Sequence, residues 1–193
     1  MSAVYRGRAQ GHNMLVFNPN TQEDFVWESN TPLIRFESTP TAAIAVYDNS
    51  EGYSRWCSQV TRGFYIGDNR RSLTVRDEFT VLEPNTVVYW NMHTNAEIEI
   101  QGNSAILTQN GKKLRIDFCT NAADFELIAA ADEPIEGTFA DTSYMESDAD
   151  KNKLMLKLTA GGACYIEAKL YPDGEPAAES GMRNTPISQW ELP

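Results

Sequence analysis

The feature that most constrains this chain is a repeated alternation of short apolar runs and turn residues. The runs hold four to eight residues each, are rich in β-branched and aromatic types, and are bounded by Gly, Asn, Asp or Pro. None sustains a helical periodicity for as many as ten residues. The pattern predicts an all-β fold, an antiparallel β-sandwich of roughly 12 strands, with residues 1–193 as a single domain. The thirteen expected strands are MLVF, DFVWE, LIRFES, AIAVYD, TRGFYIG, SLTVRDEF, TVVYWNMH, EIEI, SAILT, KLRIDF, FELIAA, KLMLKL and CYIEAKLY.

Two neighbouring turn signals predict a three-stranded antiparallel meander near residues 97–118. Gly102-Asn103 and Asn110-Gly111 both suit two-residue hairpin turns. Both hairpins place the same residues of the middle strand on the buried face, and this agreement supports the meander. The expected cross-strand pairs are Ile100–Ala105, Ile98–Leu107, Leu107–Leu114 and Ala105–Ile116.

A third hairpin is predicted around Asn69-Arg70. Its apolar ladder ends in an arginine–aspartate pair on the core-directed face, and a buried pair of this kind is expected to be structural. The expected pairs are Ile66–Leu73, Phe64–Val75 and Arg62–Asp77.

Three stretches are not expected to form strands. Residues 53–57, YSRWC, lack strand alternation and are predicted to form a loop or one helical turn. Residues 132–152 carry many carboxylates and few apolar anchors, which predicts a long solvated connection. Their SDAD run lacks the glycine and the distal glutamate of an EF-hand loop. The C-terminal stretch is expected to be a loop, with Trp190 packed against the sandwich.

The chain is acidic, with 27 Asp and Glu residues against 16 Lys and Arg residues and a formal net charge of −11. This balance opposes nonspecific binding to nucleic acid or to a membrane surface, and an acidic ligand would need a local basic pocket. No apolar run reaches the roughly 18 residues of a membrane span, and the N-terminus has no apolar signal-peptide core. We therefore expect neither nucleic acid nor membrane as a partner.

The three cysteines, Cys57, Cys119 and Cys164, are widely spaced and odd in number. They form no CxxC pair and no disulfide framework, so the simplest interpretation is three mostly buried apolar thiols. The pattern leaves the redox compartment open.

The strand expected over residues 86–94 presents two different sets of side chains. Its core set is apolar, whereas the other set places an aromatic ring beside hydrogen-bonding groups, which suits a pyranose ring or a face covered by a second layer. Tyr89 and His93 are the candidate substrate-binding residues on this strand. The two faces carry Val88, Trp90 and Met92 on one side and Tyr89, Asn91 and His93 on the other.

The segment YRGRAQGHNMLVFNP, residues 5–19, concentrates two arginines, a tyrosine and one of the two histidines. Gly11 permits a close backbone approach or an unusual φ just before His12. His12 is a candidate metal ligand, general base or structural residue. With only two histidines in the chain, a zinc site would need carboxylate ligands, and no local spacing supplies them. The sequence also lacks a nucleophile elbow and a phosphate-binding glycine loop, and no catalytic residue is assigned.

This segment, followed by VTRGFYIGDNRRSLTVRDEF and YWNMHTNAEIEIQGNSAILTQNGKKLRI, resembles the C-terminal β-sandwich region of heparinase II/III-like polysaccharide lyases. The ordered similarity covers about residues 5–120. The resemblance implies β-elimination on uronic-acid-containing polysaccharides, in a cleft between an N-terminal α-helical toroid and the sandwich. It also implies a zinc ion in the sandwich, with His12 matching a histidine ligand in the family's GHN segment. Arg8 and Asn13, beside His12, are assigned to binding the acidic substrate.

The chain also departs from the family. The helical toroid and its catalytic Asn/His and Tyr residues are absent, as is the start of the sandwich, where the family has its other metal ligands. Met14 follows GHN, where the family commonly has threonine. The chain is therefore expected to be inactive alone, as a truncated lyase, a split gene product or a domain kept for another purpose.

Three functions remain open. The first is the C-terminal part of a polysaccharide lyase. The second is a non-catalytic carbohydrate-binding sandwich that uses the Tyr89 face or the arginines near His12. The third is a structural module that pairs with another chain through an exposed sheet edge. For the first two, the expected ligand is an acidic polysaccharide or oligosaccharide. Members of the family are generally exported, whereas this chain carries no signal.

Overall fold

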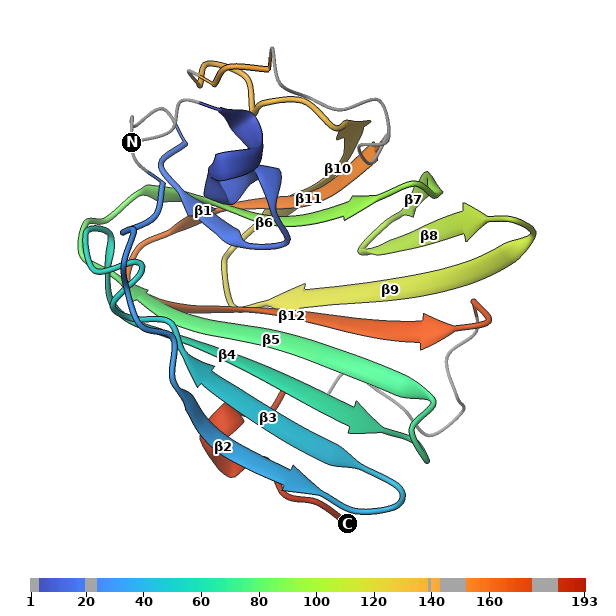
Figure 1. The fold of residues 1–193 in the computed structure, drawn as a ribbon. Coiled ribbons are helices and arrows are strands. Elements are labelled where there is room, and N and C mark those ends of the chain that lie inside the picture. The colour runs from blue at the N-terminus through green and yellow to red at the C-terminus, as the bar shows by residue number, and fades with distance from the viewer. Residues whose placement is uncertain (1–3, 20–23, 139, 143–151, 175–183) are drawn as a thin grey trace.

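The computed structural model describes residues 4–19, 24–138, 140–142, 152–174 and 184–193. These residues contain twelve strands in two antiparallel sheets (Figure 1), which confirms the expected all-β sandwich. The helical elements of this part of the chain are three short 3-10 turns, η1 (Tyr5–Gly7), η2 (Ala9–Gly11) and η3 (Ile187–Gln189).

The smaller sheet has four strands and the larger has eight. In spatial order, the smaller sheet contains β1 (Leu15–Phe17), β6 (Thr86–Thr94), β11 (Asn152–Ala160) and β10 (Phe125–Ala131). The larger contains β2 (Leu33–Ser38), β3 (Ala43–Asp48), β4 (Cys57–Gly67), β5 (Ser72–Val81), β12 (Ala163–Pro172), β9 (Lys112–Thr120), β8 (Ser104–Gln109) and β7 (Glu97–Gln101). The last described strand, β12, thus lies in the middle of the larger sheet and joins β2–β5 to β7–β9.

The three predicted hairpins are confirmed in their registers. Strands β7, β8 and β9 form the meander, and β4 and β5 form the third hairpin. Because the side-chain period of a strand is two, a slip of one residue would have moved every side chain to the other face. The pairs observed include Ile100–Ala105, Ile98–Leu107, Leu107–Leu114, Ala105–Ile116, Ile66–Leu73, Phe64–Val75 and Arg62–Asp77.

The main core lies between the two sheets. Val88 and Trp90 of β6 point into it, and Trp90 packs edge-on against Phe118 of β9 with ring centroids 5.4 Å apart. The smaller sheet covers only part of the larger one, and the β2–β3 end extends well beyond it (Figure 1). The inner face of the larger sheet is thus part of the main core only where the smaller sheet covers it.

The strand predicted over residues 24–28 is not formed, and that prediction is wrong. Phe25 packs edge-on against Tyr53, with ring centroids 5.2 Å apart, and its ring fills the space that a side chain at Gly52 would need. Glu28 has a φ of 65°, which an extended strand does not allow. Tertiary packing of one aromatic residue therefore overrides the local preference for a strand.

Other local predictions are confirmed. Residues 53–56 form a turn, in which the N–H of Trp56 donates to the carbonyl of Tyr53 at 2.9 Å, and Cys57 begins β4. Trp190 is 1% exposed and packs against Tyr65 of β4, so the C-terminal stretch is held against the sandwich. All three cysteines are free, two of them buried and Cys119 half-buried.

The connection after β10 is not solvated at its start, and there the prediction is wrong. Asp132 and Ile135 are both buried. They pack under the N-terminal segment, which supplies their polar partners. The SDAD run lies outside the described residues.

Candidate functional site

Two segments cover the outer face of the smaller sheet: residues 4–14 and residues 132–138. Tyr5 and Gln10 are part of the first segment, which we call the N-terminal cover, and both are buried. The side-chain oxygen of Gln10 accepts a hydrogen bond from the N–H of Ile135 at 2.9 Å, which ties the two segments together. The second layer considered for this face is therefore present, and it comes from the chain itself.

Gly11 shapes the N-terminal cover just before His12. Its α-carbon lies so close to the carbonyl of Tyr5 that a side chain at position 11 would overlap it. Glycine is the residue that permits such an approach. The close backbone approach predicted for this position is confirmed.

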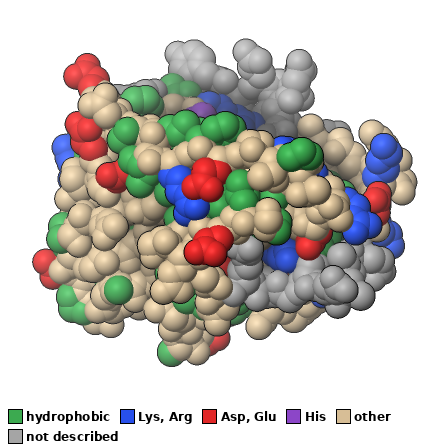
Figure 2. All heavy atoms as spheres, turned by 90° about the horizontal axis from the view of Figure 1, so that it is seen from below, with side chains coloured by type: hydrophobic (Ala, Val, Ile, Leu, Met, Phe, Trp, Pro, Cys, Tyr) green, Lys and Arg blue, Asp and Glu red, His purple; other side chains and the backbone are tan. Residues whose placement is uncertain are grey.

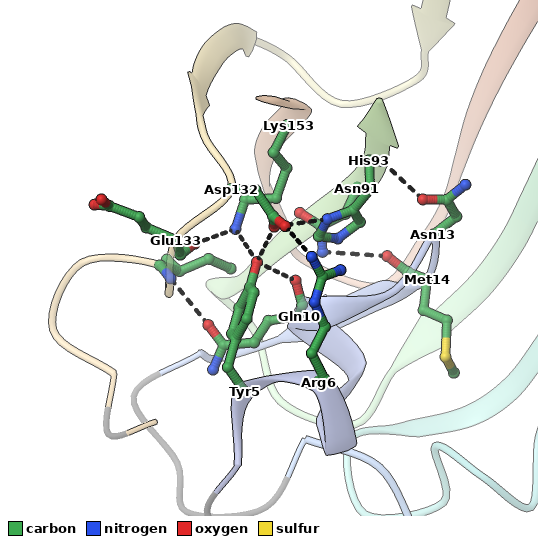
Figure 3. A network of polar contacts seen from close by, with 11 residues as sticks. Tyr5, Arg6, Gln10, Asn13, Met14, Asn91, His93, Asp132, Glu133 and Lys153 are labelled. Carbon is green, nitrogen blue, oxygen red and sulfur yellow. Dashed lines mark hydrogen bonds and ion pairs between the residues drawn. The ribbon is translucent and has the colours of Figure 1, made fainter. Parts of the chain in front are cut away.

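Asp132 is the centre of a buried polar network, which we define as Tyr5, Arg6, His93, Asp132 and Lys153 (Figure 3). Its Oδ1 accepts from the hydroxyl of Tyr5 at 2.8 Å and lies 2.8 Å from Nδ1 of His93. Its Oδ2 pairs with the guanidinium of Arg6 at 2.5 Å. The carboxylate is 2% exposed, so these contacts replace water.

Lys153 reaches the network from β11. Its ammonium donates to the carbonyl of Glu133 at 2.6 Å and to the hydroxyl of Tyr5 at 3.1 Å. Burial lowers the pKa of Lys153 to about 8, although the nearby Asp132 opposes this change. Burial and the hydrogen bond to Asp132 raise the pKa of Tyr5, so its hydroxyl stays protonated.

His93 is held as a neutral ring. Burial lowers its pKa more than the charge of Asp132 raises it. With Nδ1 facing Asp132, the Nε2 atom of His93 is buried without a hydrogen-bond partner among the described residues. Oδ1 of Asn91, two residues earlier on the same face of β6, is unpartnered there in the same way.

The network is therefore a structural clamp rather than an exposed acid–base site. It contains a tyrosine, a histidine and a lysine, but the tyrosine and lysine are each at most 1% exposed and the histidine side chain is 4% exposed. General acid–base catalysis requires the group to reach the proton that it transfers. In this conformation the N-terminal cover prevents a polysaccharide from reaching these atoms.

The predicted substrate-binding residues lie in different environments. Arg8 is 4% exposed and pairs with Asp24 at 3.3 Å, and Tyr89 is 8% exposed beneath the N-terminal cover. Neither offers surface to a ligand in this conformation. The structure brings Asn13 and His93 together, because the backbone N–H of His93 donates to Oδ1 of Asn13 at 2.8 Å.

His12 and Asn13 are exposed at the corner between the two sheets. The carbonyl of Asn13 accepts from Nη1 of Arg62 at 2.8 Å, so this corner is fastened to the inner face of the larger sheet. Of the predicted site residues, these two are the ones that a ligand can reach.

The inner face of the larger sheet carries apolar side chains that the smaller sheet does not cover. They share one face by register, and the main core cluster does not include them. Phe36 is 65% exposed, whereas Tyr47 and Phe64 are half-buried and pack edge-on with ring centroids 6.1 Å apart. We call this surface the open face: Leu33, Phe36, Tyr47, Phe64, Ile66 and Leu73.

Arg62 and Asp77 mark the border between the open face and the main core. Nε and Nη2 of Arg62 contact the two carboxylate oxygens of Asp77 at 2.6 and 3.0 Å, in the pair predicted from the hairpin register. Asp77 is fully buried, and Arg62 is 14% exposed. The open face thus ends at an arginine that also holds the His12–Asn13 corner.

Within the described part of the chain, no group of three His, Cys, Asp or Glu side chains is arranged to hold a metal ion. His12 is exposed and belongs to no such group there. The zinc site implied by the family resemblance therefore stays a prediction. Nor does any helix in these residues have the length and hydropathy to cross a membrane.

Replacing Lys153 with methionine is expected to change the pH dependence of stability. The pKa of Lys153 falls from 10.5 to about 8 on folding, so between about pH 8 and about pH 10 the unfolded chain binds more protons. Burial of the charged Lys153 therefore lowers the free energy of unfolding of the wild type by its full amount below pH 8. This penalty decreases as the pH rises through the window. Lys153→Met does not carry this penalty, so its free energy of unfolding relative to the wild type should fall by on the order of 2 kcal/mol from the lower to the upper end of the window.

Urea unfolding of both proteins across this pH range measures the effect. Using the difference between them removes common contributions such as those of Cys57 and Cys119, whose pKa values burial raises to about 12 and about 11. Lys157→Met, on the same face of β11 but half-buried, is the control and should leave the pH dependence unchanged. A constant difference between wild type and Lys153→Met would contradict the assignment.

Comparisons with known proteins leave the family open. No protein-family model matches the sequence, and no curated protein matches it. Among solved structures, the chain is similar to a 4-alpha-glucanotransferase from Thermococcus litoralis, with 5% identity and a TM-score of 0.42 over 77% of this chain and 22% of that one. It is also similar to HI1317, with 9% identity and a TM-score of 0.40 over 72% of this chain and 64% of that one. The chain thus spans less than two thirds of either protein.

Proposed function

We propose that this chain is a saccharide-binding β-sandwich of the heparinase II/III-like lyase type, which binds uronic-acid-containing oligosaccharides and is not catalytic by itself. The observation that carries the proposal is the open face, an apolar and aromatic surface that ends at Arg62 and the exposed His12–Asn13 corner. Ligand sites in proteins combine such apolar surfaces with a few convergent polar groups.

The polar border suits an acidic sugar. A guanidinium has five N–H donors, and described residues engage three of those of Arg62, two through Asp77 and one through Asn13. A planar, permanently charged group of this kind is the preferred partner for a carboxylate. A pyranose ring lying on Tyr47 or Phe64 would direct its substituents toward this border.

The buried network supports a non-catalytic role for the chain alone. Its tyrosine remains protonated and its histidine side chain is 4% exposed, so neither acts on a polysaccharide from its present position. We therefore place ligand binding on the open face rather than on Tyr89 and His93, the candidates on β6.

Tyr47→Ala is expected to weaken binding of uronate-containing oligosaccharides at least about tenfold, which is about 1.4 kcal/mol. The half-buried ring of Tyr47 would supply the surface on which a sugar stacks. Titration calorimetry with heparan sulfate and alginate oligosaccharides measures the affinity, and the same mixtures should show no rise in absorbance from an unsaturated uronate product.

Leu82→Ala is the matched control. Leu82 is also an exposed apolar residue, at 51%, but it follows the end of β5 and is not part of the open face. It should bind like the wild type, and melting curves should show both variants folded. Unchanged binding by Tyr47→Ala would refute the open face as the site. Equal affinity for neutral oligosaccharides would refute the preference for uronates.

A further inference from the structure

Strand β2 lies at one edge of the larger sheet and is more apolar than an edge strand usually is. It pairs with β3 on one side, and no described strand pairs with its other side. Leu33, Ile34 and Phe36 are 49%, 57% and 65% exposed. An edge that combines free backbone groups with exposed apolar side chains is a template for pairing with another strand.

The register shows which backbone groups are free. The N–H of Thr39 donates to the carbonyl of Ala42 at 2.8 Å, where the β2–β3 hairpin closes. Hydrogen-bonded and non-hydrogen-bonded pairs alternate along an antiparallel ladder, so Phe36 and Ser38 occupy non-hydrogen-bonded positions against β3. Their N–H and C=O groups therefore point to the free edge.

We propose that two copies of this chain pair through β2, antiparallel and about a twofold axis at Phe36. Each Phe36 then exchanges two backbone hydrogen bonds with Phe36 of the second copy. Arg35 of each copy lies opposite Glu37 of the other, on the face of the sheet away from Phe36. Cross-strand aromatic and opposite-charge pairs both stabilise a sheet, and such a contact closes as a symmetric dimer.

The charges of β2 select a second copy as the partner. Arg35 and Glu37 already pair within the strand, with Nε and Oε1 2.6 Å apart, and both remain partly exposed. In the dimer the four side chains alternate in sign, two from each copy. The strand is therefore complementary to itself in charge, although the whole chain carries a net charge of −11.

The other registers that use the same free backbone groups fail. An axis at Glu37 sets the two glutamates opposite each other, and an axis at Arg35 does the same for the arginines, which is destabilising. An axis at Ser38 places Phe36 opposite Pro40, which has no N–H to donate. The axis at Phe36 avoids both problems. Figure 2 shows acidic, basic and hydrophobic side chains interspersed over the face seen from below, without a large area of one sign among the described side chains.

Charge reversal tests the pairing. The wild type should have twice the 21.6 kDa mass of the chain by light scattering or sedimentation. Glu37→Arg and Arg35→Glu each bring like charges together at both ends of the interface and should yield monomers. The double variant Arg35→Glu/Glu37→Arg restores opposite charges and should restore the dimer.

Glu99→Arg is the control, because Glu99 is exposed on β7, the edge strand at the other end of the same sheet. It should remain dimeric, and melting curves should show every variant folded. A monomeric wild type, a dimer that survives Glu37→Arg, or a double variant that stays monomeric would overturn the proposal. These substitutions leave Tyr47 and Arg62 intact, so their outcome is independent of saccharide binding.

Discussion

Replacing Asp132 with alanine is expected to lower the free energy of unfolding by about 3–5 kcal/mol, because it leaves buried groups without their counter-charge. The carboxylate is the acceptor for Tyr5 and the ion-pair partner of Arg6. Lys153 contributes a second cation beside it. Without Asp132, Arg6 loses its ion-pair partner, and the buried ammonium of Lys153 loses the carboxylate that most favours its charged form.

The adjacent residue provides the control. Glu133 contacts Lys153 through its backbone carbonyl, and its own side chain is exposed, so Glu133→Ala should change stability by about 0.5 kcal/mol or less. Chemical unfolding measures both variants. Trypsin should also cleave Asp132→Ala faster after Arg6 or Arg8, because the N-terminal cover loses its main tie. A variant that unfolds and resists trypsin like the parent would show that Asp132 does not hold this segment.

Arg62→Ala is expected to cost a similar amount, about 3–5 kcal/mol, for a related reason. Asp77 is 0% exposed to solvent, and both oxygens of its carboxylate are bonded to Arg62. Loss of the guanidinium strands this carboxylate next to Tyr53, whose pKa burial already raises. It also releases the carbonyl of Asn13, so the corner at His12 should loosen.

Arg35→Ala is the matched comparison for Arg62→Ala. Arg35 also pairs with a carboxylate at 2.6 Å, but the two side chains are 29% and 45% exposed. Exposed ion pairs contribute about 0–1 kcal/mol, so this variant should unfold almost like the wild type at a concentration where both are in the same oligomeric state. Equal unfolding midpoints for Arg62→Ala and the wild type would contradict the role assigned to the buried pair.

Local patterns in the sequence predicted the hairpins well because short-range rules determine their registers. Asn110-Gly111 fits a tight turn, and alternation then settles which side chains face inward. The Arg62–Asp77 pair followed from the same counting. Each of these contacts joins residues that are close in sequence and depends on one turn.

The division into two sheets and the buried network could not be read in this way. Lys153 lies 148 residues from Tyr5, and Asp132 lies 126 residues from Arg6. Nothing in the alternation of either strand identifies such a distant partner. The failed strand at residues 24–28 has the same cause, because its conformation depends on Tyr53 and Gly52 rather than on its own sequence.

The candidate site shows a related limit. Alternation correctly separated Tyr89 and His93 from the core face of β6, but it does not say whether the second face meets solvent or another layer. Here the N-terminal segment covers that face. The open face, in contrast, consists of residues that have the sequence pattern of ordinary core positions, such as Phe64 and Ile66. The main core does not include them because the smaller sheet stops short of them, which alternation does not reveal.

The position of the last two strands has a consequence for biosynthesis. Strand β11 lies between β6 and β10, and β12 lies between β5 and β9, so the last two described strands each take an interior position in a sheet. During translation, the strands made earlier have unpaired edges, and such edges are prone to pair with other chains. Neither sheet has its full set of described strands until residues 152–172 have been made. The two sheets are thus complete only after the other ten described strands have been made, with Gly161-Gly162 as the crossing point between the sheets.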